Sequence, residues 1–274
     1  MPDLNHSRRF DRAGLLLVGH GTRDAAGIAE FFEAAELVRK VAADRPLEAC
    51  FLELAGPTIG EGVDRLVSRG VERILVVPLL LFAAGHAKRD IPAAVAAAAA
   101  RHRGVAVLHI PALESSRHIL ALSARRFQEA IADWPPVPTE ETLLLMVGRG
   151  SSDPEATTEM RRFARLRAEQ TPVGRVLTCF LAIQTPSLAD GLAETSASGF
   201  RRIVVQPHLL FSGELSNQIR SEVKRRSGDE RPLDARQSAP QSTCRWIVTS
   251  PLGPEPELAA AVMDLVGHLL LPLP

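Results

Sequence analysis

The feature that most constrains the fold is an internal repeat. Residues 15–82 match residues 144–211 at a constant offset of 129 positions, since 144 − 15 = 129. The matches fall on apolar residues, glycines and prolines, which fix core positions and turns, so a gapless run of them indicates a shared backbone path. The chain is therefore interpreted as a duplication. The paired segments include 15–19 with 144–148, 50–52 with 179–181, Pro57 with Pro186, and 80–82 with 209–211.

Within each copy, short apolar runs alternate with longer amphipathic stretches, a pattern typical of βαβ units on a parallel sheet. We predict two tandem α/β domains, each a four-stranded parallel sheet with helices on both faces, related by an approximate twofold axis across one cleft. The expected strands are 15–20, 47–54, 73–79, 105–110, 143–148, 175–182, 202–208 and 245–249. The expected helices are 25–43, 57–69, 87–102, 114–133, 154–169, 186–198, 214–226 and 255–270.

A proline-rich segment separates the copies. Residues 134–138 read Trp-Pro-Pro-Val-Pro, and proline cannot continue a helix. We therefore predict an N-terminal domain at 1–134 and a C-terminal domain at 142–274. Two similar domains in one chain imitate a homodimer, which makes a monomer possible. Residues 227–242, rich in polar residues and proline, predict an exposed loop whose role the sequence does not indicate.

The charge balance and the cysteines exclude several classes of protein. Lys plus Arg equals Asp plus Glu at 32 each, so no long-range field would attract nucleic acid or an anionic membrane. The apolar run at 15–18 is too short for a signal peptide or a membrane span, so a cytoplasmic protein is expected. Cys50, Cys179 and Cys244 form no C-x-x-C pair, which argues against an iron-sulfur cluster and predicts buried thiols.

Three polar residues of the first copy lie where its predicted strands end. His20 follows the first strand, Glu53 ends the second, and His86 follows the third. Because ligand sites of open parallel sheets lie beyond the carboxyl ends of the strands, these side chains are expected to meet there. Two imidazoles and a carboxylate form a ligand set suited to a divalent first-row transition metal. The sequence predicts a metal site at this edge.

The second copy is an internal control for that prediction. At the offset of 129, the three polar residues are replaced by Arg149, Ala182 and Leu215, although the surrounding glycines, prolines and apolar residues persist. If the three groups were needed for folding, the second copy should retain them. A functional site, in contrast, can be lost from one copy without loss of the fold.

The motifs around these residues resemble the class II tetrapyrrole chelatases, in particular the sirohydrochlorin chelatases. The similar segments are Leu-Leu-Val-Gly-His-Gly-Thr-Arg-Asp at 16–24, Phe-Leu-Glu-Leu-Ala-Gly-Pro-Thr-Ile at 51–59, and residues 76–92 around Ala-Gly-His-Ala-Lys-Arg-Asp. Residues 146–154 and 202–211 resemble the degenerate half of the long, two-domain members.

The resemblance, which extends over about residues 13–226, implies a site and a substrate. His20 and His86 would bind the metal, and Glu53 would assist as ligand or proton acceptor. The metal, Co²⁺ or Fe²⁺, would be a substrate, and no organic cofactor is implied. Some long members end in a histidine-rich stretch and a cysteine cluster, which this chain lacks, so no iron-sulfur cluster is expected.

The implied tetrapyrrole, sirohydrochlorin, is a polycarboxylate, so local cations must hold it. The candidates are Arg23, Lys88, Arg89 and, from the second copy across the cleft, Arg149. Cobalt insertion is favoured because the segment 84–88 is closest to the cobaltochelatase form of the motif. The alternative is ferrous insertion for siroheme.

Two other functions remain open from the sequence. One is phosphoryl transfer with His20 as the nucleophile, but that chemistry would favour an arginine beside the histidine, and position 19 is glycine. The other is a non-catalytic metal carrier, which would need no tetrapyrrole site. Binding of sirohydrochlorin to the metal-free protein would separate a carrier from a chelatase.

Overall fold

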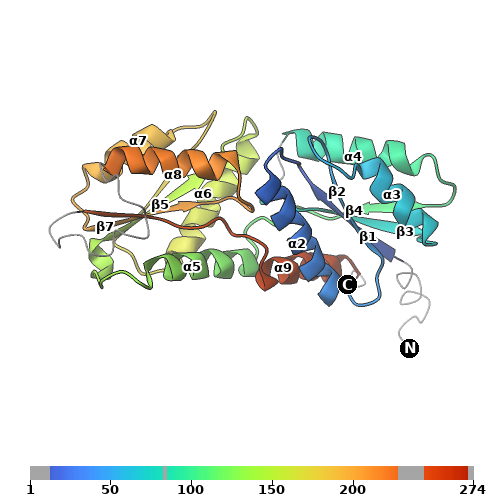
Figure 1. The fold of residues 1–274 in the computed structure, drawn as a ribbon, viewed down its shortest axis with the longest axis horizontal. Helices are drawn as coiled ribbons and strands as arrows, with labels where there is room; N and C mark the ends of the chain where they lie inside the picture. The colour runs from blue at the N-terminus through green and yellow to red at the C-terminus, as the bar shows by residue number, and fades with distance from the viewer. Residues whose placement is uncertain (1–12, 83–84, 228–243, 271–274) are drawn as a thin grey trace. The chain divides into compact units, whose positions relative to one another are not determined.

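The computed structural model describes residues 13–82, 85–227 and 244–270, which form two four-stranded parallel sheets (Figure 1). The strand order is β2-β1-β3-β4 in the first sheet and β6-β5-β7-β8 in the second. The predicted pair of α/β sheets is thus confirmed. The strands are β1 (Ala13–Gly19), β2 (Leu47–Phe51), β3 (Arg73–Pro78), β4 (Ala106–His109), β5 (Thr142–Gly148), β6 (Arg175–Phe180), β7 (Arg202–Pro207) and β8 (Arg245–Val248).

A helix follows each strand, as the predicted βαβ pattern requires. The first helix of each copy begins at an aspartate: the Asp24 carboxylate accepts hydrogen bonds from the amides of Ala26 and Gly27, and the Asp153 carboxylate accepts one from the amide of Glu155. The helices are α2 (Ala25–Val41), α3 (Ile59–Ser68), α4 (Gly85–Ala99), α5 (Arg117–Ile131), α6 (Pro154–Glu169), α7 (Leu188–Ser196), α8 (Glu214–Ser227) and α9 (Pro256–Leu270), with a short 3-10 helix η1 (Thr139–Glu141).

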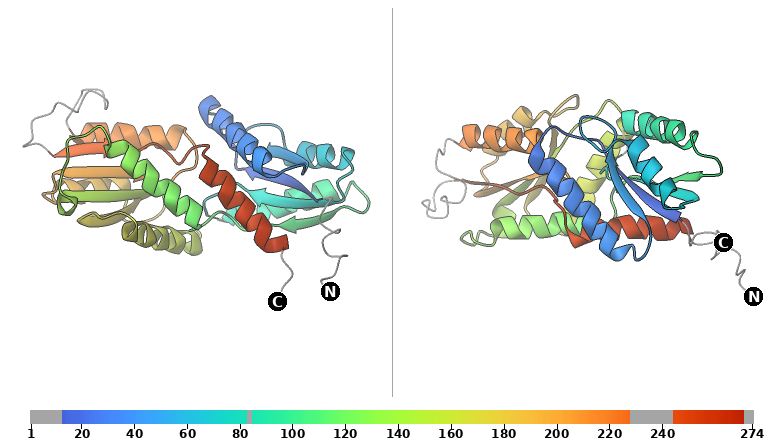
Figure 2. Two further views of the ribbon diagram at one scale, coloured as in Figure 1. Left: turned by 90° about the horizontal axis from the view of Figure 1, so that it is seen from below. Right: turned by 45° about the vertical axis from the view of Figure 1, so that its right-hand side comes forward.

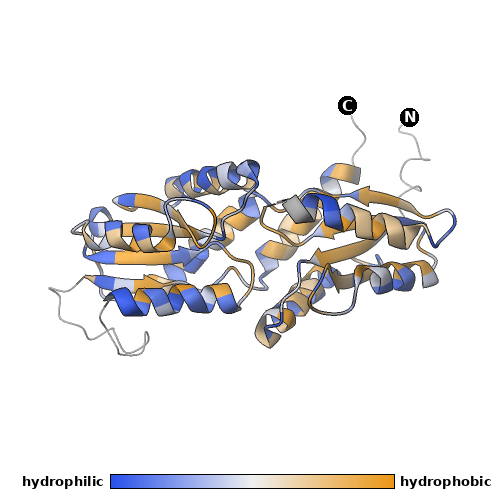
Figure 3. Ribbon diagram, turned by 90° about the horizontal axis from the view of Figure 1, so that it is seen from above, coloured by the Kyte–Doolittle hydropathy of each residue, from blue (hydrophilic) through white to orange (hydrophobic). Residues whose placement is uncertain are grey.

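The central strands β1 and β5 are buried along their whole length. Each lies in the interior of its sheet with helices on both faces, which explains their continuous apolar sequences. Figure 3 shows the strands as mostly hydrophobic and the helices as mixed. Within the described residues, none of the helices combines the length and apolar character needed to cross a bilayer.

The compact units are not the contiguous domains predicted at 1–134 and 142–274. One unit comprises residues 1–119 and 254–274, and the other comprises residues 120–253. Helix α9 packs on α2 of the first sheet (Figure 2), although it belongs to the second sequence copy. Most of α5 belongs to the second unit, where the Arg126 guanidinium donates to the Leu252 carbonyl at 2.7 Å. The last helices of the copies are therefore exchanged, which a repeat pattern cannot reveal.

The repeat continues to the end of both copies with a changed offset. Strand β4 begins at residue 106 and β8 at residue 245, so the offset there is 245 − 106 = 139, ten more than before. The extra residues fall in 228–243, so the predicted loop at 227–242 lies almost wholly outside the described residues. Cys50 and Cys179 are buried as predicted, whereas Cys244, which precedes β8, is exposed, contrary to prediction.

Candidate metal site at the edge of the first sheet

The strand order places the three predicted site residues at one edge of the first sheet. The chain runs from β1 outward to β2 and then back across β1 to β3, so the connections diverge between β1 and β3. Such a point is where open α/β sheets bind ligands. His20 directly follows β1, Glu53 lies two residues beyond β2, and His86 is the second residue of α4, which follows β3.

His20 and Glu53 are close together and partly exposed. Nδ1 of His20 lies 3.4 Å from Oε1 of Glu53, and their side chains are 33% and 55% exposed. The Nδ1 atom itself is shielded from solvent and has no hydrogen-bond partner of good geometry among the described residues. Since the side chain as a whole is one-third exposed, its solvent contact comes from the rest of the ring, and the Glu53 carboxylate lies on the Nδ1 side.

The backbone brings these two residues together. The Glu53 amide donates to the His20 carbonyl at 3.1 Å, and the Leu52 amide donates to the Gly19 carbonyl at 2.9 Å. Gly21 has a φ of +106°, and a Cβ at this position would lie 1.7 Å from the Glu53 carbonyl oxygen. Only glycine fits such a close approach, so Gly21 allows the loops after β1 and β2 to touch.

The second sheet repeats this backbone without the polar pair. The Ala182 amide donates to the Arg149 carbonyl at 3.1 Å. Gly150 has a φ of +84°, and a Cβ there would lie 1.9 Å from the Ala182 carbonyl oxygen. The side-chain amide of Gln184 donates to the Ser151 carbonyl at 2.8 Å and so links the same two loops.

The structure places His86 by its backbone alone. The residue lies in the first turn of α4, and its side chain is outside the described part of the structure. Among the described side chains, no group of three His, Cys, Asp or Glu residues could hold a metal ion. The role of His86 as the second imidazole ligand stays a prediction.

The predicted cations of the first copy lie around the same edge. Arg23 is exposed in the loop between β1 and α2, and Lys88 and Arg89 are exposed near the start of α4. The first turn of α4 contains no acidic residue. Because a helix N-terminus favours anions, cations at this end are more consistent with an anionic ligand than with helix stability. Arg149 is exposed at the equivalent edge of the second sheet.

One residue beside the site was missed by the sequence reasoning. Leu54 was expected to end a strand over 47–54, but β2 ends at Phe51. Leu54 has a φ of +64°, and the residue is 53% exposed. A leucine in an apolar run resembles a buried strand residue, so only the backbone geometry could distinguish it.

Comparisons with known proteins agree with this architecture. The CbiX family model matches residues 14–130 and 143–269, one match in each copy. The sirohydrochlorin ferrochelatase of Priestia megaterium is 36% identical over 216 residues, which cover 78% of this chain and 79% of that protein. The sirohydrochlorin cobaltochelatase of the same organism is 31% identical over 210 residues, which cover 77% and 68%.

Solved structures give the same result. The structure of SirB from Bacillus subtilis with Fe³⁺ aligns with a TM-score of 0.76 and 30% identity over 94% of this chain and 95% of that chain. The sirohydrochlorin chelatase SirB from Bacillus subtilis subspecies spizizenii, in complex with cobalt, aligns with a TM-score of 0.75 and 27% identity over 94% of both chains. With the family model matching most of both copies, this chain belongs to the CbiX family.

Proposed function

We propose that the chain is a sirohydrochlorin chelatase that inserts Co²⁺, with Fe²⁺ as the alternative metal, at His20, Glu53 and His86. The observation that carries the proposal is the contrast between two copies with the same backbone. The first copy has the His20 and Glu53 pair at the sheet edge, and the second has Arg149 and Ala182. Family membership and the named activities of the relatives support the reaction class.

In this proposal the imidazoles present the metal substrate. A neutral imidazole binds a divalent first-row metal firmly, yet each one can be exchanged for a nitrogen of the macrocycle in turn. Nε2 of His20 would bind the metal, because Nδ1 is shielded beside Glu53. His86 would supply the second imidazole from the first turn of α4.

Glu53 would accept protons. Insertion removes two pyrrole protons from the free macrocycle, and a general base near the metal accelerates that loss. The carboxylate of Glu53 is 55% exposed, so a proton taken there can pass on to water. The same carboxylate orients His20, as the partner of a metal-binding histidine commonly does.

The cations would hold the carboxylates at the rim of the macrocycle. Arg23 lies in the loop after β1, and Lys88 and Arg89 lie near the start of α4, which follows β3, so all three belong to segments beyond the carboxyl ends of these strands. Arg149, at the equivalent edge of the second sheet, is proposed to contribute as well. A chain without net charge offers no long-range attraction, so these local groups would supply the affinity for the anionic substrate.

The test is metal insertion into sirohydrochlorin by the metal-free protein under anaerobic conditions. Cobalt and ferrous iron are supplied separately, and the change in macrocycle absorbance is followed. A rate above the uncatalysed rate is expected for at least one metal, with His20→Ala as the matched inactive control. A protein that binds cobalt but neither binds sirohydrochlorin nor accelerates insertion would instead be a metal carrier.

A further inference from the structure

Large apolar side chains are rarely exposed in the described part of the chain. Three large apolar residues of that part are exposed, with Leu54 at 53% and Ile183 at 72%; the third is Val41. Leu54 and Ile183 occupy the same position of the two copies, since 183 − 54 = 129. Leu54 immediately follows Glu53 in the candidate site. An exposed apolar residue retained at one position of both copies calls for a physical explanation.

The backbone at this position is strained in both copies. The Ala55 amide donates to the Glu53 carbonyl at 2.8 Å across Leu54, whose φ is +64°. In the second copy the Gln184 amide donates to the carbonyl two residues before it, across Ile183 with a φ of +65°. A three-residue turn with positive φ at its centre is rare and strained, and a bulky or β-branched residue is especially unfavourable there.

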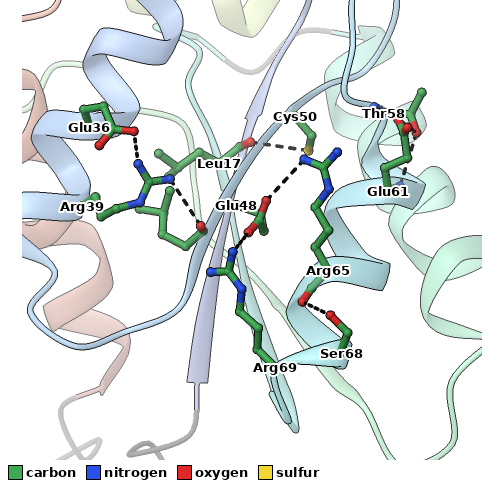
Figure 4. A network of polar contacts seen from close by, with 11 residues as sticks. Leu17, Glu36, Arg39, Glu48, Cys50, Thr58, Glu61, Arg65, Ser68 and Arg69 are labelled. Atoms are coloured by element: carbon green, nitrogen blue, oxygen red, sulfur yellow. Dashed lines mark hydrogen bonds and ion pairs between the residues drawn. The ribbon is translucent and has the colours of Figure 1, made fainter.

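Neighbouring interactions fix the turn after β2. The Thr58 side chain and the Glu61 carboxylate form a capping box at the start of α3, four residues beyond Leu54. The Phe51 amide at the end of β2 donates to the Pro57 carbonyl at 2.8 Å. At the other end of β2, the buried Glu48 carboxylate lies 2.6 Å from Nη2 of Arg69, the residue after α3 (Figure 4). The capping box and the hydrogen bond from Phe51 to Pro57 close the segment that contains Leu54, so the backbone can keep a conformation that Leu54 does not favour.

The hydrogen bonds around the turn account for the positive φ of Leu54, but they do not account for a large apolar side chain at this position. Glycine would adopt a φ near +60° without penalty, and asparagine would tolerate it. A side chain that is more than half exposed gains little from packing within the protein. The turn itself, shared with Ile183, belongs to the scaffold of both copies, whereas only the Leu54 side chain adjoins the candidate metal site, where backbone strain commonly serves ligand binding.

We propose that Leu54 is a substrate-binding residue that contacts the apolar face of the tetrapyrrole during metal insertion. This inference rests on the proposed function. A metal enters a macrocycle through the face of the ring, so the groups that present it must lie against that face and not against the carboxylate rim. Leu54, next to Glu53 in the chain, supplies apolar surface there, whereas the surrounding cations suit the rim.

The decisive experiment is Leu54→Gly in the full-length protein. The substitution removes the apolar contact and relieves the positive φ at the same time. We expect the KM for sirohydrochlorin to rise by about 5-fold to 10-fold. Because glycine favours this backbone, the midpoint of thermal unfolding should rise by about 1–3 °C. A purely structural role predicts no change in KM.

Three further variants separate substrate contact from other effects. Ile183→Gly measures by thermal unfolding how much strain relief the same turn gives in the copy that lacks the His20 and Glu53 pair. Val41→Ala removes an exposed apolar side chain at the far end of α2, where KM should not change. Leu54→Met keeps the apolar surface and should restore KM to within about twofold of the wild-type value.

The readouts distinguish this inference from the proposed function. If the wild-type protein does not insert metal, the proposed function itself fails. If it does, an unchanged KM in Leu54→Gly overturns the role of Leu54. A fall in the unfolding midpoint of Leu54→Gly would also overturn it, because Leu54 would then be packing within the protein. Cobalt affinity without tetrapyrrole should remain at the wild-type value, since Leu54 carries no metal ligand.

Discussion

The loops after β1 and β5 share a backbone and differ in chemistry. Gly21 and Gly150 make the same close approach to the following loop, at 1.7 and 1.9 Å from a carbonyl oxygen to a hypothetical Cβ. The first pair of loops carries His20 beside Glu53, and the second carries an arginine and an alanine instead. The comparison teaches that the fold depends on glycines and apolar residues, whereas the candidate site depends on a few replaceable side chains.

A second difference lies in the helix layer on one face of each sheet. In the second unit, Nε of the fully buried Arg167 donates to the Ser123 hydroxyl at 3.0 Å, and the Gln206 amide donates to the Ser123 carbonyl at 2.7 Å. Burial lowers the pKa of Arg167 to about 10, and no carboxylate pairs with it among the described residues. At the equivalent positions the first unit has Val38, Val77 and Val262, all buried.

This difference matches the exchange of the last helices. Ser123 lies on α5 and Val262 on α9, at the later offset of 262 − 123 = 139. Helix α5, which carries Ser123, therefore packs in the unit that contains Arg167. Helix α9, which carries Val262, packs in the unit that contains Val38 and Val77. The reverse pairing would bury a guanidinium against a valine, at a cost of several kcal/mol. The polar contacts thus favour the observed assignment of each helix.

The largest expected effect is on catalysis in the first copy. His20→Ala and His86→Ala should each reduce metal insertion by at least about 100-fold, because each would remove one of the two proposed imidazole ligands. Their thermal unfolding should match that of the wild type, since the second copy tolerates Arg149 and Leu215 at these positions. Full activity in His20→Ala would break the contrast between the copies, and early unfolding would restore a structural role.

Replacing the buried polar residues Arg167, Ser123 and Gln206 by valine, as in the first unit, tests how much the polar contacts contribute to stability. Arg167→Val alone should lower the free energy of unfolding by about 3 kcal/mol, because the buried Ser123 and Thr171 lose the guanidinium that donates to them. The triple variant with Ser123→Val and Gln206→Val should recover most of that loss. Chemical denaturation measures both. Equal losses in the single and triple variants would mean that the polar network itself stabilises the unit.

Glu53→Gln tests whether the carboxylate, which Ala182 replaces in the second copy, acts as a base. The amide keeps a hydrogen-bonding oxygen near His20 but cannot act as a base, so turnover should fall by about 100-fold. Cobalt affinity should change much less than in His20→Ala. Titration with cobalt and steady-state insertion rates check the two effects. A parallel loss of affinity and rate would indicate that Glu53 is a metal ligand.

His208 should make the stability of the second unit depend on pH, and its counterpart in the first copy, Leu79, cannot titrate. Complete burial lowers the pKa of His208 to about 3. The unfolded chain binds this proton near pH 6.5, so His208 disfavours the folded state progressively as pH falls below that value. Between pH 7 and pH 5 the loss should be about 2 kcal/mol. His208→Leu should flatten unfolding free energy over this range, and an unchanged slope would contradict the assignment.

The smallest expected effect concerns the cations. Arg23→Ala and Arg149→Ala should each raise the KM for sirohydrochlorin by about 3-fold to 10-fold with little change in kcat, because these groups would bind substrate and transition state alike. Steady-state kinetics checks both variants. Arg149 is the more informative, because an effect would show that the degenerate copy still binds substrate. An unchanged KM in both would mean that other residues hold the carboxylates.

The repeat allowed most of the fold and part of the site to be predicted from the sequence. The strands, the helices and the approach of His20 to Glu53 follow from apolar periodicity and from the rule that parallel strands end at one edge. The positive φ and the exposure of Leu54 could not be predicted, because a leucine at the end of an apolar run has the pattern of a buried strand residue. The burial of Arg167 was equally hidden, because a helical arginine is usually at the surface.

The sequence by itself determined that the chain is a duplicated α/β protein and that only its first copy keeps the candidate ligands, since both conclusions depend on residue types at a fixed offset. The tertiary structure alone decided which helix covers which sheet. Helices α5 and α9 occupy the same place in their copies, so local periodicity suits either partner. Long-range packing, with Ser123 beside Arg167 and α9 on α2, selects between them.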